Sequence, residues 1–361
     1  MGELKNQPMF FLGANSPKGF VESFSSSFSA NDGWHTYIIK GGAGTGKSTL
    51  MKRVADHFIS KGLRCHLCPC SSDPNSLDAV IFPDVKVMLL DGTAPHIVEP
   101  KYPGACEEII NLGECWDAKK LINNRESIIE VTKENKEFHR KAGSYLAAAG
   151  CVLSDTFEVA NASLQEDKAI KFARKLSKKY LKKTKLKGIE WVRYLSGITP
   201  KGLIFYGSTL EKMVDTKIVI SDEFGAASAR IMGELRNEAI NKGYEIISCF
   251  CPMKPKTKVE HIIIPSLRLA FCTKNRFHNI ASDERIIHAR RFMDVKRLHE
   301  QRARLNFNRK IVAEFLNLSS DALNDAKEAH DRLEALYIQA MDYKKLNEVT
   351  KQIIIKINSI I

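Results

Sequence analysis

The chain has 361 residues, with 55 Lys and Arg against 42 Asp and Glu, and therefore a formal net charge of +13. This length predicts about two domains, and the ordinary apolar and charged content excludes a largely disordered chain. Residues 1–17 lack the regions of a secretory signal, no apolar run is long enough to span a bilayer, and nine cysteines in a chain of this size favour reduced thiols. We therefore expect a cytoplasmic protein with anionic partners.

The first segment with a chemical signature follows an expected strand at about 37–40 and opens an amphipathic helix at 47. It matches the pattern G-x-x-x-x-G-K-[S/T] and consists of Gly41, Gly42, Ala43, Gly44, Thr45, Gly46, Lys47, Ser48 and Thr49. Glycines let the backbone N–H groups curl around phosphate oxygens, and the helix adds its positive end. Lys47 is expected to reach the β- and γ-phosphates and the Ser48 hydroxyl to ligate Mg²⁺. The pattern predicts a nucleotide site.

Two acidic residues follow expected strands and complete the predicted site. Asp91 ends the apolar run 85–90, the place of a carboxylate that holds Mg²⁺ through water, although such an acid also caps ordinary turns. Asp73 follows the run 64–70 and is interpreted either as a base or metal partner or as turn chemistry in Ser-Asp-Pro. Cys65, Cys68 and Cys70 are predicted to be buried strand cysteines rather than zinc ligands.

The sequence also repeats itself at a spacing of about 180 residues. Residues 11–20 are answered by 194–203, residues 37–39 by 218–220, and residues 80–83 by 262–265. This collinearity predicts an α/β fold that is a tandem duplication of a P-loop NTPase-type parallel-sheet domain, each copy followed by a helical segment. The expected units are 1–190, with a helical part at about 106–187, and 191–361, with a helical part at about 282–361. Leucines at 316, 323, 333 and 336 favour a helical hairpin or bundle.

The second copy lacks the chemical groups of the first. Its loop begins with Asp222 and Glu223, which bring negative charge to the place where phosphates would bind. Aligned by letters, the replaced pairs are Gly46 with Ala227, Lys47 with Ser228, Ser48 with Ala229, Asp91 with Thr273 and Asp73 with Lys254. The joint loss predicts that these residues form one functional set and that the second copy does not bind nucleotide.

Other residues persist in both copies. Lys18 is answered by Lys201, and His96 by His278, which favours a structural role because the pairs survive without the phosphate loop. His96 has the alternative role of a substrate contact. A further hypothesis is that an arginine of the second copy, Arg230 or Arg268, completes the site.

The positive charge is concentrated in one segment, from Lys168 to Lys187. Its basic residues are Lys168, Lys171, Arg174, Lys175, Lys178, Lys179, Lys182, Lys183, Lys185 and Lys187. The plainer interpretation is a solvated helix face, and the alternative is a contact surface for nucleic acid or another polyanion.

Three stretches carry a resemblance to a known group of proteins: 70–78 (CSSDPNSLD), 90–96 (LDGTAPH) and 103–114 (PGACEEIINLGE). They resemble an uncharacterised family of internally duplicated P-loop ATPases from Gram-positive spore-forming bacteria. The resemblance covers nearly the whole chain and implies the fold and ATP as the ligand, but no substrate. Relatives in that group can keep a second phosphate loop, which is degenerate here.

Three functions agree with these patterns. The first is a single-site Mg-ATPase whose second copy is an inactive regulatory or partner-binding half. The second is a small-molecule kinase with Asp73 as base, and the third an ATP-gated switch that binds nucleic acid or protein. Because Gly92 and Thr93 follow Asp91, the usual water-activating glutamate is missing there, which favours a kinase or slow switch over a motor. The absence of Asn-Lys-x-Asp favours ATP over GTP.

Overall fold

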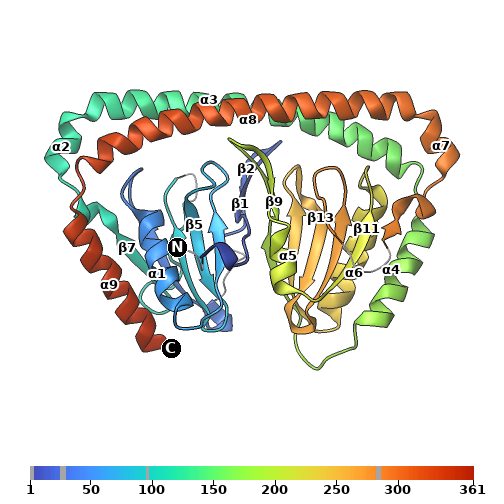
Figure 1. The fold of residues 1–361 in the computed structure, drawn as a ribbon, viewed down its shortest axis with the longest axis horizontal. Helices are drawn as coiled ribbons and strands as arrows, with labels where there is room; N and C mark the ends of the chain where they lie inside the picture. Colours follow the sequence, from blue (N-terminus) through green and yellow to red (C-terminus); the bar gives the residue numbers. More distant parts are fainter. Residues whose placement is uncertain (1–3, 25–29, 95–96, 282–285) are drawn as a thin grey trace.

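The chain folds into two α/β lobes that lie side by side beneath two long helices (Figure 1). The structure is a computed structural model and describes residues 4–24, 30–94, 97–281 and 286–361. His96 lies outside the described residues. Within the described ranges, no helix has both the length and the apolar character needed to cross a bilayer.

The first lobe holds a hairpin and a five-stranded sheet. Its elements are β1 (Gly13–Ser16), β2 (Gly19–Glu22), β3 (His35–Lys40), α1 (Lys47–Ile59), β4 (His66–Pro69), β5 (Leu77–Phe82), β6 (Val87–Asp91) and β7 (Glu107–Asn111). The sheet order is β4-β5-β6-β3-β7, and α1 packs its face of Leu50, Val54 and Phe58 against it. The expected helix at 47 is thus confirmed.

The sheet is mixed, which corrects the expectation of a parallel sheet. β3 runs parallel to β6 and β7, whereas β5 runs antiparallel to both β4 and β6. The reason is the length of the connections, because the loop 70–76 and the turn 83–86 are too short for the crossover that parallel strands need.

The second lobe repeats this order of elements and adds a strand, β8 (Ile189–Arg193), and a short helix, α5 (Ser208–Met213). Its other elements are β9 (Ser196–Thr199), β10 (Gly202–Phe205), β11 (Thr216–Ser221), α6 (Ala226–Asn241), β12 (Glu245–Cys251), β13 (Lys254–Ile264), β14 (Leu269–Lys274) and β15 (Ile287–His288). The strand order β15-β11-β14-β13-β12 reproduces β7-β3-β6-β5-β4 with the same directions, and β8 adds a parallel edge. In the first lobe a single parallel bridge between Met9 and Leu67 lies at that edge.

The remaining helices exchange between the lobes. They are α2 (Ala118–Asn123), α3 (Arg125–Asn161) and α4 (Glu166–Tyr180) after the first lobe, and α7 (Val295–Glu300), α8 (Arg302–Ile338) and α9 (Tyr343–Ile360) after the second. α3 runs above both lobes, so that α4 packs against α6 of the second lobe (Figure 1). α8 runs back antiparallel to α3, so that α9 packs against α1 of the first lobe. Each long helix therefore pairs with the long helix of the other half.

Apolar contacts and capping residues fix this arrangement. Leu146 and Ala149 of α3 share a buried cluster with Leu316 and Leu323 of α8. Leu346 and Ile357 of α9 belong to the core of the first lobe. Three aspartates accept the first free N–H groups of α2, α7 and α9, namely Asp117, Asp294 and Asp342.

The two lobes share a core of their own. Phe10, Leu12 and Ile38 of the first lobe are buried together with Leu195 and Ile247 of the second. The backbones of Phe11 and Tyr194 exchange two hydrogen bonds of 2.8 and 2.9 Å. The lobes are thus packed as one body rather than joined by a linker.

The repeated Pro-Lys-Gly segments form the turns of the two hairpins. Gly19 and Gly202 both have φ of +89°, a value that favours glycine, and each closes a two-stranded hairpin. Lys18 and Lys201 are exposed in these turns, and Pro17 lies against Gly150 of α3. This position agrees with the structural role expected for the retained lysines.

Candidate nucleotide site

The loop 41–46 lies at the carboxyl end of β3 and leads directly into α1, as the pattern requires. Two of its glycines need their conformational freedom: Gly44 has φ of +65° and Gly46 has φ of +82° at the helix N-cap. The Thr45 hydroxyl donates a hydrogen bond of 2.9 Å to the Gly42 carbonyl across the loop. Residues Gly41–Gly46 thus form the curled segment between strand and helix that was expected.

Lys47 and Asp91 come together at this loop. The Lys47 Nζ donates to the carbonyls of Gly41 and Gly42 at 3.2 and 2.7 Å and lies 3.6 Å from Asp91 Oδ2. Asp91 ends β6, which neighbours β3 in parallel, and its other oxygen accepts the Thr93 backbone N–H at 2.9 Å. Both side chains are largely buried, at 12% and 15% exposure. A cation and a carboxylate therefore meet at the mouth of the loop, as predicted.

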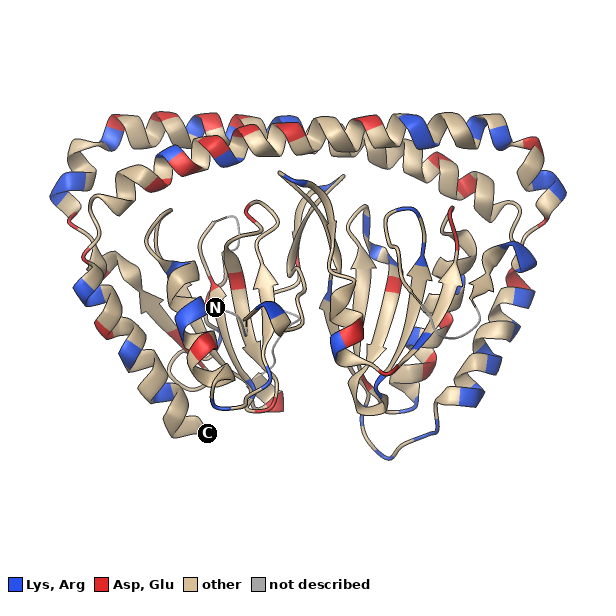
Figure 2. Cartoon of the chain, in the orientation of Figure 1, with Lys and Arg blue, Asp and Glu red and all other residues tan. Residues whose placement is uncertain are grey.

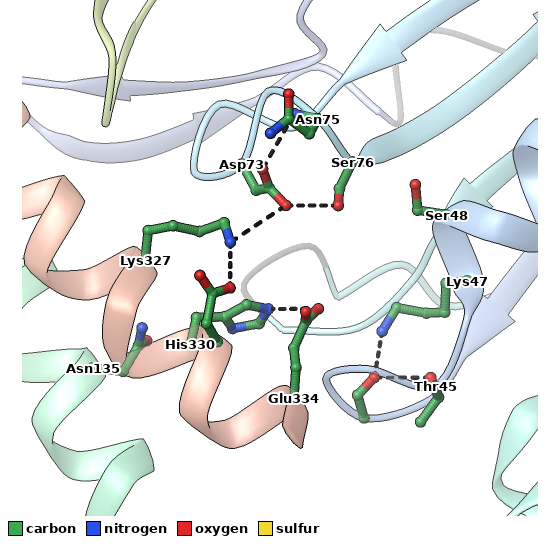
Figure 3. Close-up of polar contacts among 12 residues, drawn as sticks. Thr45, Lys47, Ser48, Asp73, Asn75, Ser76, Asn135, Lys327, His330 and Glu334 are labelled. Carbon is green, nitrogen blue, oxygen red and sulfur yellow. Dashed lines mark hydrogen bonds and ion pairs between the residues drawn. The ribbon is translucent and has the colours of Figure 1, made fainter. Parts of the chain in front are cut away.

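Ser48 and Asp73 are brought to the same side by the turn between β4 and β5. The Ser48 hydroxyl oxygen accepts the Leu77 backbone N–H at 3.0 Å, which ties the end of this turn to the first turn of α1. Asp73 accepts the Ser76 hydroxyl at 2.8 Å and the Asn75 backbone N–H at 3.2 Å. These local bonds match the turn interpretation of Asp73, although its carboxylate also faces Lys327 of a neighbouring helix (Figure 3).

That helix is α8, and its contribution was not foreseen from the sequence. Lys327 lies 3.8 Å from Asp73 Oδ2, and His330 lies 3.4 Å from Glu334 Oε1 (Figure 3). The hydrogen bond with His330 lowers the pKa of Glu334 against the opposing effect of burial, and the Lys327 charge and the Gly44 backbone N–H add to the lowering. The nearest backbone atom of Glu334 lies only 2.7 Å from where a Cβ on Gly44 would be. The backbone of α8 thus packs against the loop 41–46, and the Glu334 carboxylate is close enough to the Gly44 N–H group for that group to lower its pKa.

The counterpart loop in the second lobe is shorter and already occupied by its own side chain. Four residues separate β11 from α6, against six between β3 and α1. Gly225 has φ of +78° and caps α6, so the structural partner of Lys47 is Ala226 and not Ser228, which corrects the alignment by letters. The Asp222 carboxylate accepts the N–H groups of Phe224, Gly225 and Ser228 at 3.2, 3.0 and 2.8 Å. The Asp222 side chain therefore already accepts the backbone N–H groups that could otherwise bind an external anion.

The other expected groups lie away from the loop. Arg230 pairs with Glu166 at 2.8 Å and Arg268 with Asp215 at 2.6 Å, both in the second half of the molecule. The cation that α8 brings to the first lobe is a lysine, Lys327, instead of either arginine. Cys65 and Cys68 are buried and Cys70 is half-buried, all as free thiols; only Cys68 lies in β4, and the other two directly flank that strand.

The basic segment forms the outer face of α4 and the loop after it (Figure 2). Ala169, Ala173 and Leu176 face the second lobe, whereas every lysine from Lys168 to Lys187 is exposed. Arg174 pairs with Glu234 of α6 at 2.7 Å. The solvated helix face is therefore confirmed, and a polyanion contact stays a prediction.

No family model, curated protein or solved structure matches this chain. The resemblance to duplicated bacterial P-loop ATPases thus stays a prediction.

Proposed function

We propose that the chain is a Mg-ATP-binding P-loop NTPase that hydrolyses ATP at a single site in its first lobe. The observation that carries this proposal is the meeting of Lys47 and Asp91 at 3.6 Å beside the curled loop 41–46. Lys47, released from the carbonyls of Gly41 and Gly42, supplies positive charge to the phosphates. Ser48 and Asp91 are oxygen donors of the kind that Mg²⁺ prefers, directly or through water.

The proposal includes a tandem duplication whose second copy has lost the site. The matching strand orders and the matching succession of helices support it. The carboxylate of Asp222 supports the loss, because a phosphate entering that loop would meet a negative charge in contact with three N–H groups.

The test is Mg-ATP binding and phosphate release by the purified chain beside Lys47→Ala and Asp91→Ala. A charge-assisted hydrogen bond is worth about 1.5–3 kcal/mol, so Lys47→Ala is expected to weaken ATP binding about 10- to 100-fold. Asp91→Ala is expected to bind ATP but to lose Mg²⁺-dependent turnover.

The matched control is Lys61→Ala, an exposed lysine just after α1, which is expected to behave as the unsubstituted chain. Failure of the unsubstituted chain to bind Mg-ATP would overturn the proposal. Turnover that persists in Asp91→Ala would remove Asp91 from the site. The kinase alternative has less support, since the Asp73 carboxylate is already in contact with the Ser76 hydroxyl and the Lys327 Nζ.

The contact between α8 and the loop supports a second candidate function, an ATP-gated switch that binds a polyanion. Glu334 lies against the loop, and α8 is packed along α3, which leads to the basic α4. A nucleotide that displaces Glu334 would move α8 relative to α3 and so reposition the lysines.

This second candidate predicts binding of fluorescently labelled single-stranded DNA that weakens with salt and changes on addition of Mg-ATP. Replacing Lys178, Lys182 and Lys183 together by Glu is expected to abolish the binding. The control replaces exposed lysines of α9, Lys344 and Lys351, in the same way. DNA binding that does not change on addition of Mg-ATP would exclude the switch and would leave the ATPase proposal unaffected.

A further inference from the structure

A group of buried polar side chains lies in the second lobe, away from the nucleotide site. It consists of Glu260 and His261 of β13 and His278 from the loop after β14. Their exposed fractions are only 4%, 1% and 2%. Burying three polar groups together costs free energy unless each finds a partner.

A bulge in β13 places two consecutive residues in one site. Cys249 pairs with His261 and Phe250 with Val259, which leaves Glu260 as the extra residue of the strand. Because side chains of a regular strand alternate between faces, the bulge is what allows Glu260 and His261 to share a site. In the first lobe Asp78 and Ala79 occupy the matching positions, so the histidine is special to the second lobe.

We infer that Glu260, His261 and His278 form a binding site for a divalent transition-metal ion of the zinc class. One ligand atom from each of the three lies within 4.8 Å of the others. His261 Nε2 is 3.1 Å from His278 Nδ1, which is 3.4 Å from Glu260 Oε2. Two ligands of a tetrahedral zinc ion with bonds of about 2.0–2.1 Å are about 3.3 Å apart, so these separations suit a shared ion.

The protonation states and outer contacts suit a metal site. Burial lowers the pKa of His261 to about 3 and also lowers that of His278, so both rings are neutral near pH 7. Burial alone would raise the pKa of Glu260, but the charge of Lys258 holds it at about 2. Lys258 donates to Glu260 Oε1 at 2.8 Å and leaves Oε2 for the ion, the usual support of a ligating carboxylate.

The histidines are positioned by their surroundings. The Phe205 ring stacks on His278 with a centroid distance of 4.4 Å, and Asn275 accepts the His278 backbone N–H at 3.0 Å. Phe205 also lines a pocket of about 250 Å³ together with Leu210, Lys217 and Ile280. Phe205 thus lies between this pocket and the His278 ring.

The test uses the full chain without an affinity tag, treated with a chelator and then titrated with Co²⁺ as a spectroscopic probe and with Zn²⁺. We expect one Co²⁺ per chain, a visible absorption band of tetrahedral intensity, displacement by Zn²⁺, and a rise in the thermal midpoint when Zn²⁺ is present. His278→Ala and Glu260→Gln are expected to weaken metal binding by at least about tenfold.

Two controls separate this site from other ligands. His299→Ala removes an exposed histidine of α7, and Asp91→Ala removes the carboxylate of the proposed nucleotide site; both are expected to keep the metal affinity. An unsubstituted chain that binds neither ion at micromolar concentrations would overturn the inference and leave a hydrogen-bonded histidine pair. This measurement on the unsubstituted chain does not depend on whether the variants fold. Binding retained in His278→Ala or lost in Asp91→Ala would overturn it as well.

Discussion

The loops that precede α1 and α6 each lie beside a carboxylate, but the two carboxylates come from different elements. In the second lobe Asp222 belongs to the loop itself and accepts the N–H groups of Phe224 and Gly225 in the loop and of Ser228 in the first turn of α6. In the first lobe Glu334 approaches from α8 and lies against Gly44. An acid on a separate helix can be displaced, whereas an acid within the loop is part of its fold.

We therefore predict that Glu334→Ala strengthens Mg-ATP binding. One hydrogen bond contributes about 0.5–1.5 kcal/mol, and removal of a competing acceptor should raise the affinity about 2- to 10-fold. Calorimetric titration with ATP measures the change, and Glu328→Ala, an exposed acid of the same helix, is the matched control. Weaker binding in Glu334→Ala would show that the carboxylate supports the site instead of competing for it.

The residues of the first loop could be predicted from the sequence, but those of α8 could not. Gly41 to Ser48 follow the fixed spacing G-x-x-x-x-G-K-[S/T], which predicts a loop between a strand and a helix. Lys327, His330 and Glu334 belong to an amphipathic helix whose pattern shows that it has a buried face but not what covers that face. The two-residue difference between the loops escaped the alignment because neighbouring small residues in 222–230 resemble one another.

At the scale of elements, the contact between α3 and the first hairpin depends on a glycine. A Cβ added at Gly150 would lie 2.6 Å from Pro17 Cγ, whereas one at Gly143 of the same helix has no atom within 4 Å. The same substitution at the two positions should thus have opposite effects on stability.

We predict that Gly143→Ala stabilises the chain by up to about 1 kcal/mol, since alanine is the better helix former. Gly150→Ala should destabilise it by about 1–3 kcal/mol through overpacking against Pro17. Denaturant unfolding of both variants measures the difference. Equal stabilisation by Gly143→Ala and Gly150→Ala would mean that the β1–β2 hairpin moves away from α3 at no cost and that its contact with Gly150 does not contribute to stability.

The direction of the strands was predictable in part. β3, β4 and β6 lie where apolar runs indicate, within a few residues. β5 was missed although residues 80–83 are apolar, because a short buried run between two turns has no periodicity of its own. The short loop 70–76 nevertheless argues against a parallel neighbour, and it is this loop that makes the sheet mixed.

At the scale of the molecule, the exchange of helices was beyond the sequence. The two helical parts were expected to follow their own copies, and their lengths agree, since α3 and α8 each have 37 residues. An apolar face can be covered equally well by the neighbouring lobe or by the distant one. Only the packing of α4 on α6 and of α9 on α1 distinguishes these outcomes.

The exchange also sets the order in which the chain completes its fold during synthesis. α1 begins at Lys47, but its apolar partner α9 begins only at Tyr343, far later in the sequence. Domains usually fold as they leave the ribosome, N-terminal first. In this protein the sheet and α1 of the first lobe are made long before α9, the helix that covers their apolar face. The second lobe is the opposite case, because α4 is made before the strands and the helix α6 that it covers. The loop 41–46 therefore gains its neighbours Glu334 and Leu346 only after most of the second half has been made.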